Sequence, residues 1–249
     1  GRIAMISNKS GNFDIYILSS DDGKIIKKII SGERSSEYEE MHILKPGISW
    51  SPDGDKIAFS AKSGKSDDLF IYDIKTSKVA KHRLGLEGIF RPSWSPTGDI
   101  IAFIGNNGYS SDLYTFSLSS QEIVNKTNDM YSDDHVSWSD DGKALYFISD
   151  RADSSKEIEF IENFQFDIFV LDIESNSIIR LTDTPHNEQF PIQKIDLITG
   201  KRYIAFISDE SEINNIYISG EFNIPDVEVF SDSSSKAINQ FKNMLANCM

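Results

Sequence analysis

A tryptophan motif recurs in this chain at a fixed interval of 44 residues, and this spacing constrains the fold more than any other feature. The three copies read SWSPDGDKIAF, SWSPTGDIIAF and SWSDDGKALYF. Their repeated positions are Trp50, Trp94 and Trp138, then Gly54, Gly98 and Gly142, and then Phe59, Phe103 and Phe147. Self-similarity at a fixed period of roughly 20–50 residues is the signature of a repeat architecture, in which each repeat forms one supersecondary unit.

A second apolar run follows each copy of the motif. The runs are DLFIYDI at 68–74, DLYTFSL at 112–118 and DIFVLDI at 167–173, and the insertion SSKEIEFIENFQ delays the third. A weaker copy without the tryptophan, GKRYIAFISDESEINNIYISG, starts at Gly200. A partial copy opens the chain with RIAMIS, which resembles the second strand of the unit. The unit therefore occurs about five times.

Each repeat is predicted to form four short antiparallel strands. In the second repeat these are ISWS, KIAFSA, LFIYDI and KVAKHRL, joined by short linkers rich in Gly, Asp, Ser and Lys, as hairpins require. Pro52 presets φ for a turn and Gly54 accepts positive φ, so SPDG is predicted to be the turn between the first two strands. We therefore interpret the motif as turn and core, with the three tryptophans at equivalent core positions on the innermost strands.

Large and small side chains alternate along these strands, since Ile57 and Phe59 share one face and Ala58 lies on the other. Sheets buried on both faces and repeated at this period predict an all-β fold, a β-propeller of four-stranded antiparallel blades. The propeller is predicted over residues 1–230, with blades near 1–31, 43–86, 88–130, 134–183 and 188–230. About five blades are visible, and the count rises to six or seven if blades are missing from this sequence.

The two ends of the chain depart from the repeat. The first blade lacks its innermost strand, which is expected to come from upstream residues or from VEVFS at Val227. Residues 231–249 form a C-terminal tail in which Ile238, Phe241, Leu245 and Cys248 recur at helical spacing. This spacing predicts a short helix, and a frayed terminus is the alternative.

These repeats resemble the WD-like repeats of TolB-type β-propellers. The resemblance is carried by SWSPDGDKIAFSA with DDLFIYDIKTSK, by SWSPTGDIIAFIG with SDLYTFSL, and by SWSDDGKALYFISDR with FDIFVLDIESNSIIRLTDT, and it extends to about residue 220. The family includes the periplasmic TolB protein, which binds protein partners, and propellers appended to peptidases. The resemblance therefore implies a periplasmic or exported scaffold for protein binding, or a domain of a larger peptidase.

Charge and composition exclude several classes of partner. The formal net charge is −14 over 249 residues, so phosphate backbones and anionic lipids are repelled, and neither nucleic-acid binding nor membrane insertion is expected. No apolar run approaches the length of a membrane span. Cys248 is the single cysteine, so an internal disulfide is impossible. The sequence starts at Gly1 without methionine, and we interpret it as a fragment or processed product, either monomeric or part of a larger chain.

The sequence lacks the common motifs of catalysis. It has no G-x-S-x-G nucleophile elbow, no H-E-x-x-H zinc motif and no glycine-rich phosphate loop. Asp-Gly pairs such as Asp53-Gly54 do not match a calcium-binding EF-hand loop, and hairpin turns explain them. We therefore expect no catalytic residue, no cofactor and no enzymatic activity in this chain itself.

Acidic residues and histidines gather in the stretches just before the innermost strands. In a propeller these stretches lie near the mouth of the central channel, and binding surfaces are commonly built from loops on a rigid scaffold. The candidate partner-binding residues are Glu39, Glu40, His42, Glu87, Arg91, Asp133, Asp134, His135, His186 and Glu188. Asp133 and Asp134 are also weak calcium candidates, although a basic protein segment demands less exact geometry than a metal. A solvated acidic rim without a function is the alternative.

Two functions from different classes follow. The first is a non-catalytic binding module that holds a protein or peptide partner at the channel mouth. The alternative is an accessory domain of a hydrolase, which gates substrate toward a catalytic domain absent from this sequence. A peptidase motif in sequence beyond this chain would favour the alternative.

Overall fold

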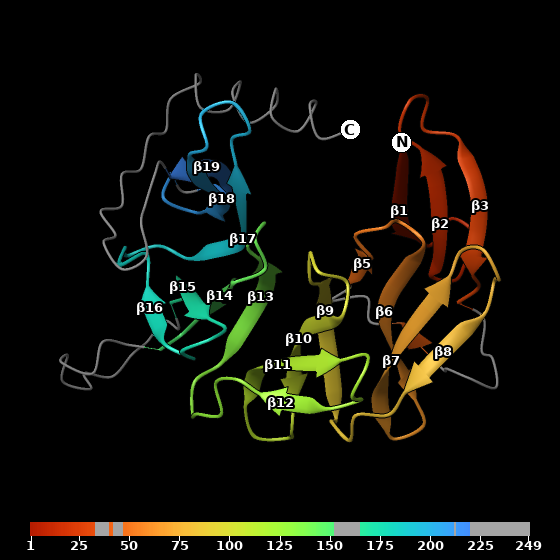
Figure 1. Ribbon diagram of the computed structural model, residues 1–249, viewed down its shortest axis with the longest axis horizontal. Helices are drawn as coiled ribbons and strands as arrows, with labels where there is room; N and C mark the ends of the chain where they lie inside the picture. The colour runs from red at the N-terminus through yellow and green to blue at the C-terminus, as the bar shows by residue number, and fades with distance from the viewer. Residues whose placement is uncertain (33–39, 42–46, 152–164, 212, 220–249) are drawn as a thin grey trace. The chain divides into compact units, whose positions relative to one another are not determined.

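The computed structural model describes residues 1–32, 40–41, 47–151, 165–211 and 213–219 (Figure 1). The described residues form five antiparallel sheets and no helix, which confirms the all-β propeller with five visible blades. Among them there is no helix long and apolar enough to cross a bilayer. The chain divides into two compact units, with the boundary between Thr127 and Asn128. The predicted tail helix and the VEVFS strand lie outside the described residues.

The first unit contains three sheets, which we number as blades 1 to 3. Blade 1 has the order β1-β2-β3, with β1 (Arg2–Ser7), β2 (Asp14–Ser19) and β3 (Ile25–Ile30). In blade 2, β4 (Glu40–Met41) and β5 (Ile48–Trp50) both pair with β6 (Lys56–Ser63), followed by β7 (Ser66–Asp73) and β8 (Val79–His82). Blade 3 consists of β9 (Gly88–Trp94), β10 (Ile100–Asn106), β11 (Ser111–Ser117) and β12 (Ile123–Asn125).

The second unit contains blades 4 and 5. Blade 4 consists of β13 (Asp133–Trp138), β14 (Ala144–Ser149), β15 (Asp167–Asp172) and β16 (Ile178–Arg180). Blade 5 consists of β17 (Glu188–Ile195), β18 (Arg202–Ser208) and β19 (Asn215–Ser219) within the described residues. The innermost strands of the two blades are joined directly, because the Ser137 hydroxyl donates a hydrogen bond of 2.5 Å to the backbone carbonyl of Pro191.

Both faces of the central strands are buried. On β6, Ile57 and Phe59 are 0 % and 1 % exposed on one face, and Ala58 is 0 % exposed on the other. One apolar cluster joins blades 2 and 3 through residues such as Leu69 and Phe103, and another joins blades 4 and 5. The alternation of large and small side chains therefore serves sheets stacked face to face, as the sequence predicts.

The repeated turn depends on the serine that follows each tryptophan. Ser95 is buried, and its hydroxyl accepts hydrogen bonds of 3.2 Å from the backbone N–H groups of both Gly98 and Ile100. The equivalent hydroxyl of Ser139 accepts from the N–H groups of Lys143 and Ala144, at 3.1 and 3.0 Å. The serine replaces the hydrogen bonds that the tight turn takes away from the backbone. Sequence reasoning missed this role, although the serine recurs at the same interval as the tryptophan.

The three tryptophans occupy equivalent positions, as predicted. Trp50, Trp94 and Trp138 pair with Ile57, Ile101 and Leu145 on the second strands of their blades. Trp94 and Trp138 are buried. The indole N–H of Trp94 donates a hydrogen bond of 3.0 Å to the backbone carbonyl of Gly98 in the turn. Trp50 is only half-buried, and the guanidinium of Arg2 lies 5.1 Å from its ring. Blade 1 ends at β1 in the described residues, so Arg2 takes over part of the cover of Trp50.

Candidate functional site

The predicted site residues fall on both units. Glu39 and His42 lie outside the described residues, and for Glu40 only the backbone position in β4 is described. In the first unit, Glu87 is exposed directly before β9, and Arg91 lies within β9. The second unit brings five of the residues to the beginning of β13 and β17, namely Asp133, Asp134, His135, His186 and Glu188.

A strained bulge interrupts each of the three long inner strands. Arg91, His135 and Phe190 occupy equivalent positions, and their φ values of 51°, 53° and 53° are uncommon for residues other than glycine. The pairing register shifts beside each of them. In the second unit the bulge turns the His135 ring onto the Phe190 ring, with 3.9 Å between their centroids. His135 is 9 % exposed, so the aromatic contact holds it in the blade interface.

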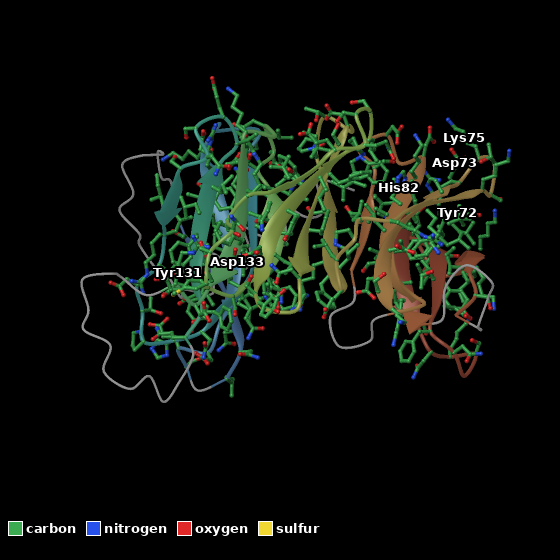
Figure 2. All side chains as sticks on the ribbon, turned by 90° about the horizontal axis from the view of Figure 1, so that it is seen from below. Tyr72, Asp73, Lys75, His82, Tyr131 and Asp133 are labelled. Carbon is green, nitrogen blue, oxygen red and sulfur yellow. The ribbon has the colours of Figure 1, made fainter. Side chains whose placement is uncertain are left out.

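Asp133 is buried in an ion pair at the first residue of β13. Its carboxylate is 0 % exposed and accepts a hydrogen bond of 2.9 Å from the Arg151 guanidinium, which also lies 3.2 Å from Asp129. The same guanidinium lies over three aromatic rings, at 5.3 Å from Phe147, 5.4 Å from Phe169 and 5.7 Å from Tyr131. Asp133 and Tyr131 lie in the same part of blade 4 (Figure 2). A partner would have to displace Arg151 to reach this carboxylate.

Glu188 takes the position of Asp133 in the next blade. Asp133 pairs with Ser149 and Glu188 pairs with Ser208, each at the start of the inner strand. Glu188 is 1 % exposed, and its carboxyl group accepts hydrogen bonds from the hydroxyls of Thr184 and Thr182, at 2.6 and 3.2 Å. It makes no salt bridge among the described residues. Burial, opposed by the threonine hydrogen bonds and reinforced by the charge of Asp167, raises the pKa of Glu188 to about 7.

The neighbouring cation, Arg180, is engaged elsewhere. Its guanidinium donates a hydrogen bond of 2.5 Å to the carboxylate of Asp167 and lies 2.8 Å from that of Asp183. Burial raises the pKa of Asp167 despite the pairing with Arg180. The single hydroxyl proton of Thr182 is shared between the two carboxyl groups, because Thr182 lies 3.4 Å from Asp167 and 3.2 Å from Glu188.

A cavity of about 400 Å³ opens beside Glu188 within the second unit. Its size falls in the range of pockets that hold small ligands or single side chains. Its walls combine acidic, hydroxyl and aromatic groups with one cation, and its lining residues include Thr184, Glu188, Phe206, Ser208, Glu210 and Tyr217. This cavity is the candidate functional site of the described chain, and Glu188 is the one predicted site residue that lines it.

Another set of charged residues repeats through the blades with a structural role. A buried aspartate lies within the first three residues of β2, β7, β11 and β15, and it contacts a polar residue on the following strand, β3, β8, β12 or β16. The pairs are Asp14 with Lys28 at 3.2 Å, Asp68 with Lys81 at 3.0 Å, Asp112 with Asn125 at 2.9 Å and Asp167 with Arg180 at 2.5 Å. Burial acts to raise the pKa of Asp14, but hydrogen bonds led by that of the Gly32 N–H outweigh it and hold this pKa far below its usual range.

No group of three or more His, Cys, Asp or Glu side chains in the described part of the chain is arranged to hold a metal ion. The Asp133 carboxylate, a weak calcium candidate from the sequence, is engaged with Arg151. The carboxylate of Asp134 accepts a hydrogen bond of 2.8 Å from the N–H of His135. Neither carboxylate points with a third acidic group toward a common centre in the residues described.

Comparison with models of protein families shows which family the repeats belong to. The profile of the TolB beta propeller domain matches residues 35–162, which is just over half of the chain. The chain belongs to the TolB β-propeller domain family. No curated protein matches the sequence.

Several solved structures share the fold of this chain at low sequence identity. TolB from Acinetobacter baumannii is 23 % identical, with a TM-score of 0.65 over 94 % of this chain and 53 % of that chain. Putative TolB from Agrobacterium tumefaciens is 19 % identical, with a TM-score of 0.62 over 88 % of this chain and 73 % of that one. A prolyl endopeptidase is 15 % identical, with a TM-score of 0.55 over 94 % of this chain and 36 % of that one. The chain therefore spans about half the length of the A. baumannii TolB that it matches.

Proposed function

We propose that this TolB-type propeller domain is a non-catalytic binding module that holds a positively charged protein or peptide segment at the end of the blades where the inner strands begin. The observation that carries the proposal is the cavity beside Glu188. It is concave, it lies beside the loops that enter blade 5, and two glutamates, Glu188 and Glu210, line it. Binding sites are commonly placed on loops that a rigid scaffold positions.

The charge of the whole chain supports the same class of partner. A net charge of −14 attracts basic segments over long distances and repels acidic ones. Arg180 does not cancel the acidic character of the cavity, because Asp167 and Asp183 already neutralise it. A cationic group is therefore the ligand class that the cavity favours most.

A second candidate is the accessory role in a larger hydrolase. It is supported by the likeness to the prolyl endopeptidase, of which this chain covers 36 %. In that role the same acidic end of the blades would meet substrate segments or the catalytic domain. Such a domain still acts by binding, so the two candidates share the first test.

The test uses three short fluorescent peptides that differ at the same positions, where they carry arginine and lysine, glutamate, or glutamine. Fluorescence anisotropy should show binding of the basic peptide, with an affinity that falls as salt rises. The glutamate peptide should not bind. Equal binding of the basic and glutamate peptides, or no binding of the basic peptide at low salt, would contradict the proposal.

A further inference from the structure

The cavity in blade 5 lies where blade 4 keeps an arginine. Ser149 of β14 and Ser208 of β18 occupy the same position, because they pair with the first residues of β15 and β19. Two residues later, blade 4 has Arg151 and blade 5 has Glu210. The backbone N–H of each donates a hydrogen bond of 3.3 Å to the hydroxyl of the serine two residues earlier, so the two turns have the same local geometry.

In blade 4, the residues that surround Arg151 occupy the same positions as residues that line the cavity in blade 5. The Arg151 guanidinium lies over the rings of Phe147 and Phe169 and pairs with Asp133 and Asp129. The side chain of Arg151 is 12 % exposed, so these groups enclose it almost completely.

Blade 1 repeats the device with a lysine. The N–H of Lys9 donates 3.3 Å to the hydroxyl of Ser7, which is the same turn as in blades 4 and 5. The Lys9 ammonium lies 4.8 Å from the ring of Tyr16, and Tyr16 corresponds to Phe169 of blade 4. In two of these three blades the turn therefore supplies a cation to an aromatic ring on the strand that follows it.

In blade 5 the residues equivalent to those around Arg151 are similar, but a glutamate takes the place of the arginine. Phe206 and Tyr217 correspond to Phe147 and Phe169, and their rings stack with centroids 5.9 Å apart at 20°. Glu188 stands in the position of Asp133, and Thr184 stands in that of Asp129. Glu210 supplies a carboxylate where Arg151 supplies a guanidinium, and the cavity occupies the space that is left.

We propose that the cavity of blade 5 binds the guanidinium group of an arginine side chain from a partner protein, in the place that Arg151 fills in blade 4. This inference rests on the proposed binding function and specifies its ligand. The stacked rings of Phe206 and Tyr217 offer a cation–π surface, and Glu188 and Glu210 offer carboxylate oxygens. A guanidinium suits both, because it is planar, stacks on aromatic rings and pairs with carboxylates through two parallel hydrogen bonds.

The partner's arginine is favoured over lysine for the same reasons. An ammonium group is more strongly hydrated and lacks the flat surface that stacks on a ring. Thr182 and Thr184 already satisfy part of the Glu188 carboxyl group, so the incoming group must reach the remaining lone pairs with a defined direction. A forked donor does this better than a point charge.

The experiment measures binding of fluorescent peptides that are identical except at one position, which carries arginine, lysine or citrulline. Citrulline keeps the shape of arginine and removes its charge. We expect the arginine peptide to bind about tenfold more tightly than the citrulline peptide, and measurably more tightly than the lysine peptide. Free arginine amide is a separate arm, expected to compete only weakly.

The decisive variant is Glu210→Arg, which rebuilds the arrangement of blade 4 inside blade 5. Its own guanidinium should occupy the cavity, so the arginine peptide should lose at least about tenfold in affinity while the melting temperature stays equal or rises. The matched control is Glu174→Arg, which makes the same charge change at an exposed turn of blade 4 and should retain the preference for arginine. Glu210→Gln removes the charge without filling the space and should weaken binding less than Glu210→Arg.

The outcomes separate this inference from the proposed function. If basic peptides bind but arginine, lysine and citrulline are equivalent, or if Glu210→Arg binds as the parent does, the guanidinium site is wrong and the binding module stands. If no basic peptide binds, both are wrong. If free arginine amide binds as tightly as the peptide, the ligand is a small guanidine compound and the partner-protein source is overturned.

Discussion

Arg151 and Glu210 occupy the same position in consecutive blades, each two residues after a serine that accepts its N–H at 3.3 Å. The backbone is thus held constant while the side chain changes from a cation to an anion. In blade 4 this cation neutralises a fully buried carboxylate, Asp133. In blade 5 the equivalent carboxyl group, Glu188, accepts hydrogen bonds from two threonine hydroxyls and makes no salt bridge among the described residues, and a cavity lies beside it.

Removal of Arg151 should destabilise the second unit strongly. We expect Arg151→Met to lower the free energy of unfolding by about 3–5 kcal/mol, because the buried charge of Asp133 loses its ionic partner. Urea unfolding measures this loss. The control is Lys75→Met, which breaks the pair with Asp55 on an exposed turn where the Lys75 side chain is 73 % exposed (Figure 2). That loss should be much smaller, because an ion pair exposed to solvent contributes little to stability.

The double variant Arg151→Met with Asp133→Asn identifies the cause of the loss. It removes the uncompensated charge and should recover part of the stability that Arg151→Met loses. Equal losses for Arg151→Met and Lys75→Met would show that the guanidinium does not neutralise a buried charge.

The tryptophans should differ in their contribution to stability although they share a position. Trp94 is 7 % exposed and bonds to its turn, so Trp94→Ala should cost about 3–5 kcal/mol. Trp50 is half-buried, so Trp50→Ala should cost about half as much. Urea unfolding of both variants checks the order. A loss well under about 1 kcal/mol for Trp94→Ala would remove Trp94 from the core.

Much of this fold could be predicted from the sequence because the repeat is periodic in the residues that decide a blade. The 44-residue interval placed Trp94 opposite Ile101 and put the glycine of each turn at positive φ, with Gly98 at 86°. Turn geometry and strand alternation are local properties, and they are therefore visible in local sequence. The strained bulge at His135 could not be predicted from local sequence, because it depends on how one blade packs on the next.

The candidate site was less predictable, since it depends on burial and on side chains distant in sequence. Asp133 and Glu188 both look like members of a solvated acidic rim, yet Asp133 is neutralised by Arg151, 18 residues later. One signal was available in the sequence. The segments FISDR and FISDE align the two blades and show the exchange of arginine for glutamate at Glu210. Only the packed structure shows the cavity that lies beside Glu188 and Glu210.

Glu188 should make stability fall as pH rises through the neutral range. Its native pKa of about 7 lies above the ordinary value of 4.5, so native protein keeps a proton that the unfolded chain releases between these pH values. Below about pH 4.5 both states are protonated and Glu188 costs nothing, whereas above about pH 7 the full cost of about 3 kcal/mol applies. Glu188→Gln should therefore gain stability relative to the parent between pH 5 and pH 8, as measured by urea unfolding.

The control for this pH effect is Asp196→Asn. Hydrogen bonds from the N–H groups of Ile198 and Thr199 hold the pKa of Asp196 below its usual range. Its carboxylate is thus ionised in both states from pH 5 to pH 8, and this variant should change stability by the same amount at each pH. A stability difference between Glu188→Gln and the parent that does not vary with pH would show that Glu188 is already ionised in the native protein at pH 5.

Association of a basic peptide should depend on the acidic residues that remain available, and not on every acidic residue at the start of the inner strands. Glu188 and Glu210 line the cavity, whereas Asp133 is paired with Arg151 and Asp134 accepts from a backbone N–H. We therefore compare Glu188→Gln with Glu210→Gln, as a double variant, against Asp133→Asn with Asp134→Asn. Both double variants remove two acidic groups, and at a pH above the Glu188 pKa of about 7, where Glu188 is ionised, the long-range attraction falls equally in each.

Stopped-flow association of the arginine peptide across a salt series, from about 0.05 to about 0.5 M, separates the two contributions. In both double variants the association rate should fall modestly, and its salt dependence should weaken, because steering depends on total charge. Only the Glu188 and Glu210 variant should also dissociate faster, by about tenfold, since it alone loses carboxylates that contact the guanidinium. Equal dissociation rates in the two variants would mean that the peptide is attracted by the acidic surface as a whole and does not enter the cavity of blade 5.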